Sequence, residues 1–180
     1  MIRRTAVFLS GALAGAGADL AAKAWVFAHF PRGVTRVIVP RLLSFQLTTN
    51  PGIAWGLFPS RAWGVVSLFA IPVIAAAFLR RREAGRAELT CGSLILAGAA
   101  GNAWDRVVLK SVRDFIVLPW WPWMPNFNLA DAMLSCSVAV LLLIWMRHDP
   151  RPVGEARPAP AREPDDGGVG DVGRDHGPRP

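Results

Sequence analysis

Four aspartates stand apart from the other acids of this chain because each lies within or beside an apolar segment; they are Asp19, Asp105, Asp114 and Asp131. The remaining acids fall in an arginine-rich stretch near residue 85 or in the segment from residue 149 onward. Ionisable groups next to long apolar segments are costly at membrane depth and are kept where they are paired or functional. The four aspartates are therefore the first candidates for chemistry.

Asp114 and Asp131 are the two aspartates without a neighbouring cation of obvious pairing geometry. Asp114 follows the third apolar segment, and Asp131 begins the fourth, three residues after Asn128. These ends lie on one face of a bundle, so the two carboxylates can converge and share one proton. Such a pair performs general acid–base hydrolysis without a metal or cofactor. Asp131 also fits a second interpretation, an acid stabilised by the dipole at a helix N-terminus.

The other two aspartates have cations at helical spacing. Asp19 and Lys23 are four residues apart, which places them on one helix face as a structural ion pair. Asn102, Asp105 and Arg106 lie three and four residues apart at the end of the third segment. We expect Arg106 to compensate Asp105, which favours a positioning role for that aspartate.

The elements that position these residues are predicted to be membrane helices. Hydrophobic residues make up 52% of the chain and the mean hydropathy is +0.32, values typical of a small polytopic membrane protein. Four apolar segments approach the length of about 20 residues that a helix needs to cross a bilayer. They cover residues 5–28, 61–79, 89–109 and 129–146.

The arginines predict the orientation of these helices. Arginine clusters precede the first segment, separate the second from the third, and follow the fourth. Positive charge marks the cytoplasmic side, so both termini are predicted there and residues 30–60 and 110–128 on the opposite side. Arg32, Arg36 and Arg41 depart from this rule.

The two outer loops have different compositions. Residues 34–39 and 43–49 alternate and contain β-branched residues, which predicts a hairpin or small sheet. Residues 119–123 read Pro-Trp-Trp-Pro-Trp, which favours a belt at the membrane interface over a ligand cage.

The N-terminal segment has a second interpretation, and the C-terminal segment differs in composition from the rest of the chain. The N-terminus resembles a secretory signal with Ala16-Gly17-Ala18 as a cleavage site, but the apolar stretch continues to Phe27 and favours a retained helix. From Asp149 the chain is rich in Pro, Gly and Arg, which predicts a disordered cytoplasmic tail over 149–180 that follows a four-helix transmembrane domain over 1–148.

The remaining composition excludes several classes of protein. The net charge of +7 comes from arginines that flank apolar runs, without the aromatic interleaving of a nucleic-acid surface. The three scattered histidines have no metal-ligand spacing, and both cysteines lie in apolar runs. We expect no metal, no cofactor and no nucleic acid.

Five ordered motifs resemble those of signal peptidase II, the lipoprotein signal peptidases of aspartyl protease family A8. They are Asp19-Leu20-Ala21-Ala22-Lys23, Thr49-Asn50-Pro51-Gly52-Ile53-Ala54-Trp55-Gly56, Gly101-Asn102-Ala103-Trp104-Asp105-Arg106-Val107, Val112-Arg113-Asp114-Phe115 and Phe127-Asn128-Leu129-Ala130-Asp131. Their order and topology match over residues 1–147. Pro51 and Trp55-Gly56 depart from many relatives and leave the shape of that loop open.

The resemblance implies an all-α membrane protein of four transmembrane helices, with a small periplasmic β-cradle and a short periplasmic helix before the fourth helix. It implies an enzyme of the bacterial inner membrane, whose partners are membrane lipid and prolipoproteins cleaved before a diacylglyceryl-modified cysteine. We expect this enzyme to be a monomer, although the sequence leaves the oligomeric state open. Asp114 and Asp131 match the catalytic pair. Further matched positions line the site and hold substrate or the inhibitor globomycin, or support it; they are Asn50, Asn102, Arg106, Asn128, Asp19, Lys23 and Asp105.

Two other functions are compatible with parts of the sequence. A serine peptidase with a Ser–Lys dyad would have to use Lys110 and Ser111, whose side chains point in different directions because the residues are adjacent. A proton or solute carrier would use the four aspartates as a relay, but carriers usually show internal repeats and more spans.

The tail leads to a first prediction. Truncation after His148 should leave lipoprotein cleavage near the full-length rate, because a disordered segment on the cytoplasmic side is remote from aspartates on the other face. Cleavage by the two proteins in membranes, at equal insertion, measures this. A large loss of activity in a correctly inserted truncated chain would contradict it.

Overall fold

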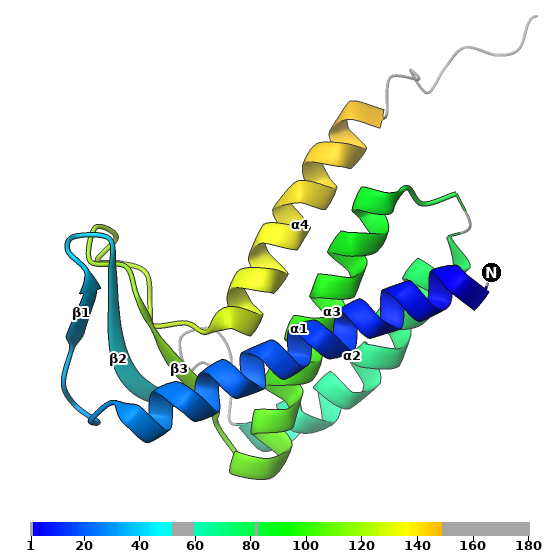
Figure 1. Cartoon of the computed structure of the whole chain (residues 1–180). Coiled ribbons are helices and arrows are strands. Elements are labelled where there is room, and N and C mark those ends of the chain that lie inside the picture. The colour runs from blue at the N-terminus through cyan, green and yellow to red at the C-terminus, as the bar shows by residue number, and fades with distance from the viewer. Residues whose placement is uncertain (1, 52–59, 82, 149–180) are drawn as a thin grey trace, which may run out of the picture. The chain divides into compact units, whose positions relative to one another are not determined.

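The structure, a computed structural model, describes residues 2–51, 60–81 and 83–148 (Figure 1). The predicted tail and the departure at Trp55-Gly56 lie outside these residues. In chain order the described elements are α1 (Ile2–His29), β1 (Arg36–Val39), β2 (Leu43–Asn50), α2 (Ser60–Arg80), α3 (Arg86–Leu109), β3 (Val112–Val117) and α4 (Leu129–His148).

Four helices form at the predicted apolar segments, with bounds that differ by up to three residues. Each observed helix contains its predicted apolar segment, and α4 begins at the predicted residue, Leu129. Two helices of the described chain are long and apolar enough to cross a membrane. These are Ile2–His29, with mean hydropathy 1.4, and Leu129–Arg147, with mean hydropathy 2.1.

The strands form one antiparallel sheet in the order β1-β2-β3. β1 and β2 confirm the hairpin expected in the first loop. β3 corrects the expectation that Asp114 lies in a loop, because Asp114 is paired with Thr48 of β2. Lys110, with φ 62°, turns the chain out of α3 directly into β3. The six residues of β3 find their hydrogen-bonding partners in a strand over 60 residues earlier, a pairing that local periodicity does not reveal.

The segment before α4 also differs from expectation. The resemblance implied a short helix there, but residues 118–128 consist of turns and extended chain. Trp121 N donates to Leu118 O at 2.9 Å, and Met124 N donates to Trp121 O at 3.0 Å. Prolines recur at every third position, at 119, 122 and 125, and each lacks the backbone N–H that a helix needs.

Two apolar clusters hold the helices and the sheet together. Phe8, Ala12 and Leu96 pack α1 and α3 against α2. Val26, Leu47 and Phe115 join the end of α1 to β2 and β3. Figure 1 shows the sheet beyond the end of α1, with α3 passing between the other helices. The outcome is a helical body whose α1 and α3 ends carry the sheet.

Close contact between α3 and α4 depends on a glycine. A Cβ atom added at Gly98 would lie 2.5 Å from the carbonyl oxygen of Ala130. This oxygen belongs to backbone and can move only with the first turn of α4. The close contact between Gly98 and Ala130 therefore determines how near α3 the next residue, Asp131, can lie.

Gly98→Ala should lower the stability of the folded enzyme, because overpacking a close contact typically costs about 1–3 kcal/mol. Gly17→Ala is the matched control, since a Cβ added at Gly17 meets no atom within 4 Å. Thermal unfolding in detergent should show a lower midpoint for the first variant only. Equal unfolding midpoints for the two variants would show that α4 moves to accommodate the added methyl group without a loss of stability.

Candidate active site

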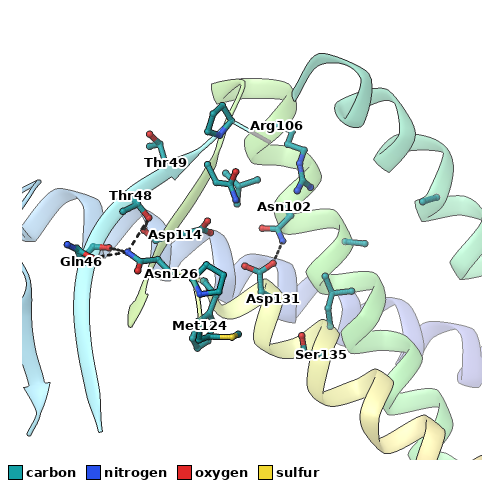
Figure 2. Close-up of a pocket in the computed structure, with 18 residues that line it drawn as sticks. Gln46, Thr48, Thr49, Asn102, Arg106, Asp114, Met124, Asn126, Asp131 and Ser135 are labelled. Atoms are coloured by element: carbon teal, nitrogen blue, oxygen red, sulfur yellow. Dashed lines mark hydrogen bonds between the residues drawn. The ribbon is translucent and has the colours of Figure 1, made fainter. Parts of the chain in front are cut away.

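A cavity of about 980 Å³ lies where the sheet meets the ends of α3 and α4 (Figure 2). It is lined from β2, α3, β3, α4 and the segment before α4, with one residue of α2. Both aspartates predicted to be catalytic line it. The sequence-based expectation that Asp114 and Asp131 approach each other is therefore met at one cavity.

Asp114 is the more strongly desolvated of the two groups that define the site. Strand β3 holds it, its residue is only 4% exposed, and its Oδ1 accepts a hydrogen bond from Asn128 Nδ2 at 2.6 Å. Burial, followed by the charge of Asp131, raises the pKa of Asp114 to about 7. Hydrogen bonds from Asn128 and Asn50 and the charge of Lys23 act in the opposite direction without cancelling this rise.

Asp131 lies in the first turn of α4 and accepts two hydrogen bonds. Asn102 Nδ2 donates to its Oδ1 at 2.8 Å, and the backbone N of Asn128 donates to its Oδ2 at 3.2 Å. Asn128 Oδ1 in turn accepts from the backbone N of Asp131 at 3.0 Å. This reciprocal cap makes Asp131 the helix-terminal acid of the second interpretation and also a member of the cavity.

Two asparagines connect the aspartates. Asn128 Nδ2 also donates to Asn102 Oδ1 at 3.1 Å, and Lys23 Nζ donates to the same oxygen at 2.9 Å. An ammonium group can only donate, so Lys23 requires that the carbonyl oxygen of Asn102 face it. The amide nitrogen of Asn102 then points to Asp131, as Figure 2 shows.

The predicted ion pair in α1 is confirmed. Lys23 Nζ lies 2.7 Å from Asp19 Oδ2, and both side chains are fully buried. Asp19 Oδ1 accepts a hydrogen bond from the backbone N of Ala130 at 2.9 Å. An acid of α1 therefore binds the N-terminal turn of α4 and fixes the helix that carries Asp131.

The expected pairing of Asp105 with Arg106 needs correction. Asp105 accepts two side-chain bonds from Arg113, at 2.7 and 3.2 Å, and a backbone bond from Arg113 N at 3.1 Å. It also lies 3.5 Å from Lys23 Nζ. Neighbouring residues of a helix point about 100° apart, so Asp105 faces β3 and α1 while Arg106 faces the cavity.

The remaining predicted residues lie at the cavity wall. Arg106 and Asn50 both line it, Arg106 one helical turn beyond Asn102. Sequence reasoning missed Asn126, whose Nδ2 donates to Gln46 O at 3.1 Å and ties the segment before α4 to β2. The signal available in the sequence was that two asparagines, Asn126 and Asn128, flank Phe127.

Lys110 and Ser111 do not line the cavity in the described part of the chain. Lys110 Nζ donates to Val107 O at 2.7 Å, and Ser111 Oγ donates to Leu109 O at 3.4 Å. Both groups are directed to backbone carbonyls, which argues against a Ser–Lys dyad.

Comparison with known proteins gives a consistent result. The chain matches the signal peptidase (SPase) II family over residues 12–147. It is 37% identical to a lipoprotein signal peptidase of Syntrophomonas wolfei over 128 residues, which cover 70% of this chain and 83% of the relative. It is 33% identical to that of Bartonella tribocorum over 157 residues, 82% of this chain and 93% of the relative.

Solved structures share the fold. Two bacterial membrane enzymes, determined by the in meso method, superpose with TM-scores of 0.74 and 0.71 at 22% and 23% identity. The first comparison covers 84% of this chain and 95% of the other, and the second covers 79% and 94%. Asp114, Asp131, Asn50 and Asn102 line one cavity, and with the matches above the chain belongs to the signal peptidase II family, the lipoprotein signal peptidases.

Proposed function

We propose that Asp114 and Asp131 are the catalytic pair with which this aspartic peptidase cleaves signal peptides from prolipoproteins. The observation that carries the proposal is Asn128, which donates to both carboxylates, one through its side chain and one through its backbone. One residue thus holds two acids at one cavity.

The two aspartates differ in a way that assigns their roles. Asp114 has a pKa of about 7 and therefore keeps a proton in a large fraction of molecules near neutral pH. Asp131 lies at the N-terminus of α4 and accepts two N–H donors, an environment that stabilises negative charge. Asp131 is then the general base and Asp114 the general acid.

In the first step the Asp131 carboxylate takes a proton from a water molecule, whose oxygen attacks the carbonyl carbon of the scissile bond. Asp114 gives its proton to the carbonyl oxygen, which produces a neutral tetrahedral diol. Both carboxyl groups have exchanged their protonation states, and no charge has been created outside the pair.

In the second step Asp131 gives its proton to the amide nitrogen, and the C–N bond breaks. Asp114 recovers a proton from a diol hydroxyl as the new carboxyl group forms. The pair returns to its starting state, with one proton and one negative charge. Arg106 and Asn50 on the cavity wall are available to hold the peptide during both steps.

The membrane arrangement is part of the same proposal. All four helices cross the bacterial inner membrane in a monomer, both termini are cytoplasmic, and the three-stranded sheet is the periplasmic cradle. The scissile bond before a diacylglyceryl-cysteine then lies at the outer membrane surface, beside the cavity. The arginine clusters and the exposed Trp120, Trp121 and Trp123 support this orientation.

The proposed function is tested directly with the purified enzyme in detergent and a diacylglyceryl-modified prolipoprotein. We expect cleavage before the lipidated cysteine, and inhibition by globomycin. Cleavage of an unlipidated precursor at the same rate would contradict the proposed substrate class.

Asp114→Asn and Asp131→Asn should each reduce cleavage by at least about 100-fold, the usual contribution of general acid–base catalysis. The double variant should be no worse, because residues that act as a unit are non-additive. Single-turnover cleavage by folded, globomycin-binding variants measures this. Lys110→Ala and Ser111→Ala are the controls and should stay near wild type. If either control abolished cleavage, a serine mechanism would replace the aspartyl one.

The pH profile of cleavage should have an alkaline limb near pH 7. Asp114 works in its protonated form, so activity is present below its folded pKa of about 7 and falls as the pH rises through it. The apparent pKa of this limb describes the two coupled carboxyl groups together.

Asn128→Ser removes the amide donor that lowers the pKa of Asp114 but keeps an oxygen that can cap α4. The alkaline limb of this variant should move to higher pH, at a reduced maximal rate. A limb that stayed in place or moved to lower pH would rule out Asp114 as the proton donor.

A further inference from the structure

A second cavity, of about 800 Å³, lies between the N-terminal halves of α1 and α3. Its lining residues come from these two helices alone, from Arg3 to Gly11 and from Arg86 to Leu94. The site residues of α3 lie at the opposite end of that helix. This cavity, the basic groove, therefore has no part in the site described above.

The deep end of the basic groove is set by a close crossing of the helices. A Cβ atom added at Gly11 would lie 2.5 Å from Ser93 Oγ, and that hydroxyl donates to Phe8 O at 2.9 Å. From this crossing the groove extends to the first turns of both helices. Figure 1 shows the α2–α3 connection at the same end of the molecule as the N-terminus of α1.

The shallow end of the groove concentrates positive charge. Arg3, Arg4 and Arg86 line it, and its described lining contains no acid. Arg4 Nη2 donates to Arg81 O, whereas the side chains of Arg3 and Arg86 are exposed and have no ion pair or hydrogen bond within the described chain. Both helices also begin here, so their positive dipole ends add to the arginines.

The nearest acid on α3 is already committed to other partners. Glu88 accepts hydrogen bonds from Gly85 N at 2.9 Å and from Trp145 Nε1 at 2.8 Å, and it lies 3.8 Å from Arg81. It does not line the groove. An arginine at a helix N-terminus is mildly unfavourable unless an anion compensates it, so an anionic ligand from outside the described chain would be stabilised at the groove.

We propose that the basic groove binds one anionic phospholipid, such as phosphatidylglycerol, from the cytoplasmic leaflet. The headgroup phosphate contacts Arg3 and Arg86, and an acyl chain lies along Val7, Leu89 and Leu94 between the helices. A free phosphate ion would use the arginines but not the apolar side chains, of which Val7 is 65% exposed. The combination of a cationic mouth and an apolar wall matches a lipid.

The test uses the full-length enzyme in detergent and phosphatidylglycerol and phosphatidylcholine of identical acyl chains. Native mass spectrometry then counts the lipids that remain bound. We expect one phosphatidylglycerol to be retained in preference to phosphatidylcholine. In the double variant R3Q/R86Q the ratio of bound phosphatidylglycerol to bound phosphatidylcholine should fall by about 30-fold, the change expected for the loss of two basic contacts to an anionic headgroup.

The matched control is R80Q/R147Q, which removes two exposed arginines from the ends of α2 and α4 on the same side. It should keep the preference, and retained cleavage by both variants shows that they fold. Equal losses in the two variants would mean general attraction to an anionic surface and would overturn the proposal. The proposal would also be overturned if the wild type retained both lipids equally, or if millimolar inorganic phosphate displaced the bound lipid. If phosphatidylglycerol were preferred only after truncation at His148, the acidic residues of the tail would be the ligand of the groove in the full-length enzyme. This result would also overturn the proposal.

Discussion

The buried ammonium group of Lys23 is the constraint on which the rest of the site depends. An ammonium out of water is tolerated only with close negative partners and filled hydrogen-bonding positions. Lys23 obtains these from Asp19 at 2.7 Å, Asp105 at 3.5 Å and the oxygen of Asn102 at 2.9 Å. Each partner also makes a second contact, because Asp19 binds α4, Asp105 binds β3, and Asn102 binds Asp131.

This arrangement explains the glycine at position 101 of α3. A Cβ atom added at Gly101 would clash with Asp19 Oδ2, so only glycine lets the carboxylate approach α3. With Arg113, the cluster holds two cations and two carboxylates, and its charges balance. A neutral cluster can be buried between three helices, whereas removal of one member leaves an uncompensated charge.

Periodicity, charge and spacing predicted the four helices, the hairpin and the Asp19–Lys23 pair, because these features are local in the chain. The partner of Asp105 could not be found in this way. Arg106 is its neighbour in sequence, yet Arg113 compensates it, because Lys110 turns the chain and brings β3 back along the end of α3. The same distant pairing with β2 created a strand where the residues alone indicated a loop. The sequence predicted that Asp114 and Asp131 converge, because the third helix ends and the fourth begins on the same side of the bundle. The role of Asn128 as their bridge depends on side-chain geometry and could not be predicted.

The difference between the two aspartates follows from the kind of backbone that carries each. Asp131 is held at a helix N-terminus, where the dipole and the amide donors of the first turn stabilise a negative charge. Asp114 is held in a strand, which has no comparable dipole, between the sheet and the helices, where burial raises its pKa to about 7. In the proposed mechanism, the use of a strand and a helix N-terminus at one cavity is what separates the acid Asp114 from the base Asp131. A site built from two helix N-termini would favour two ionised carboxylates, which could not share the single proton that hydrolysis requires.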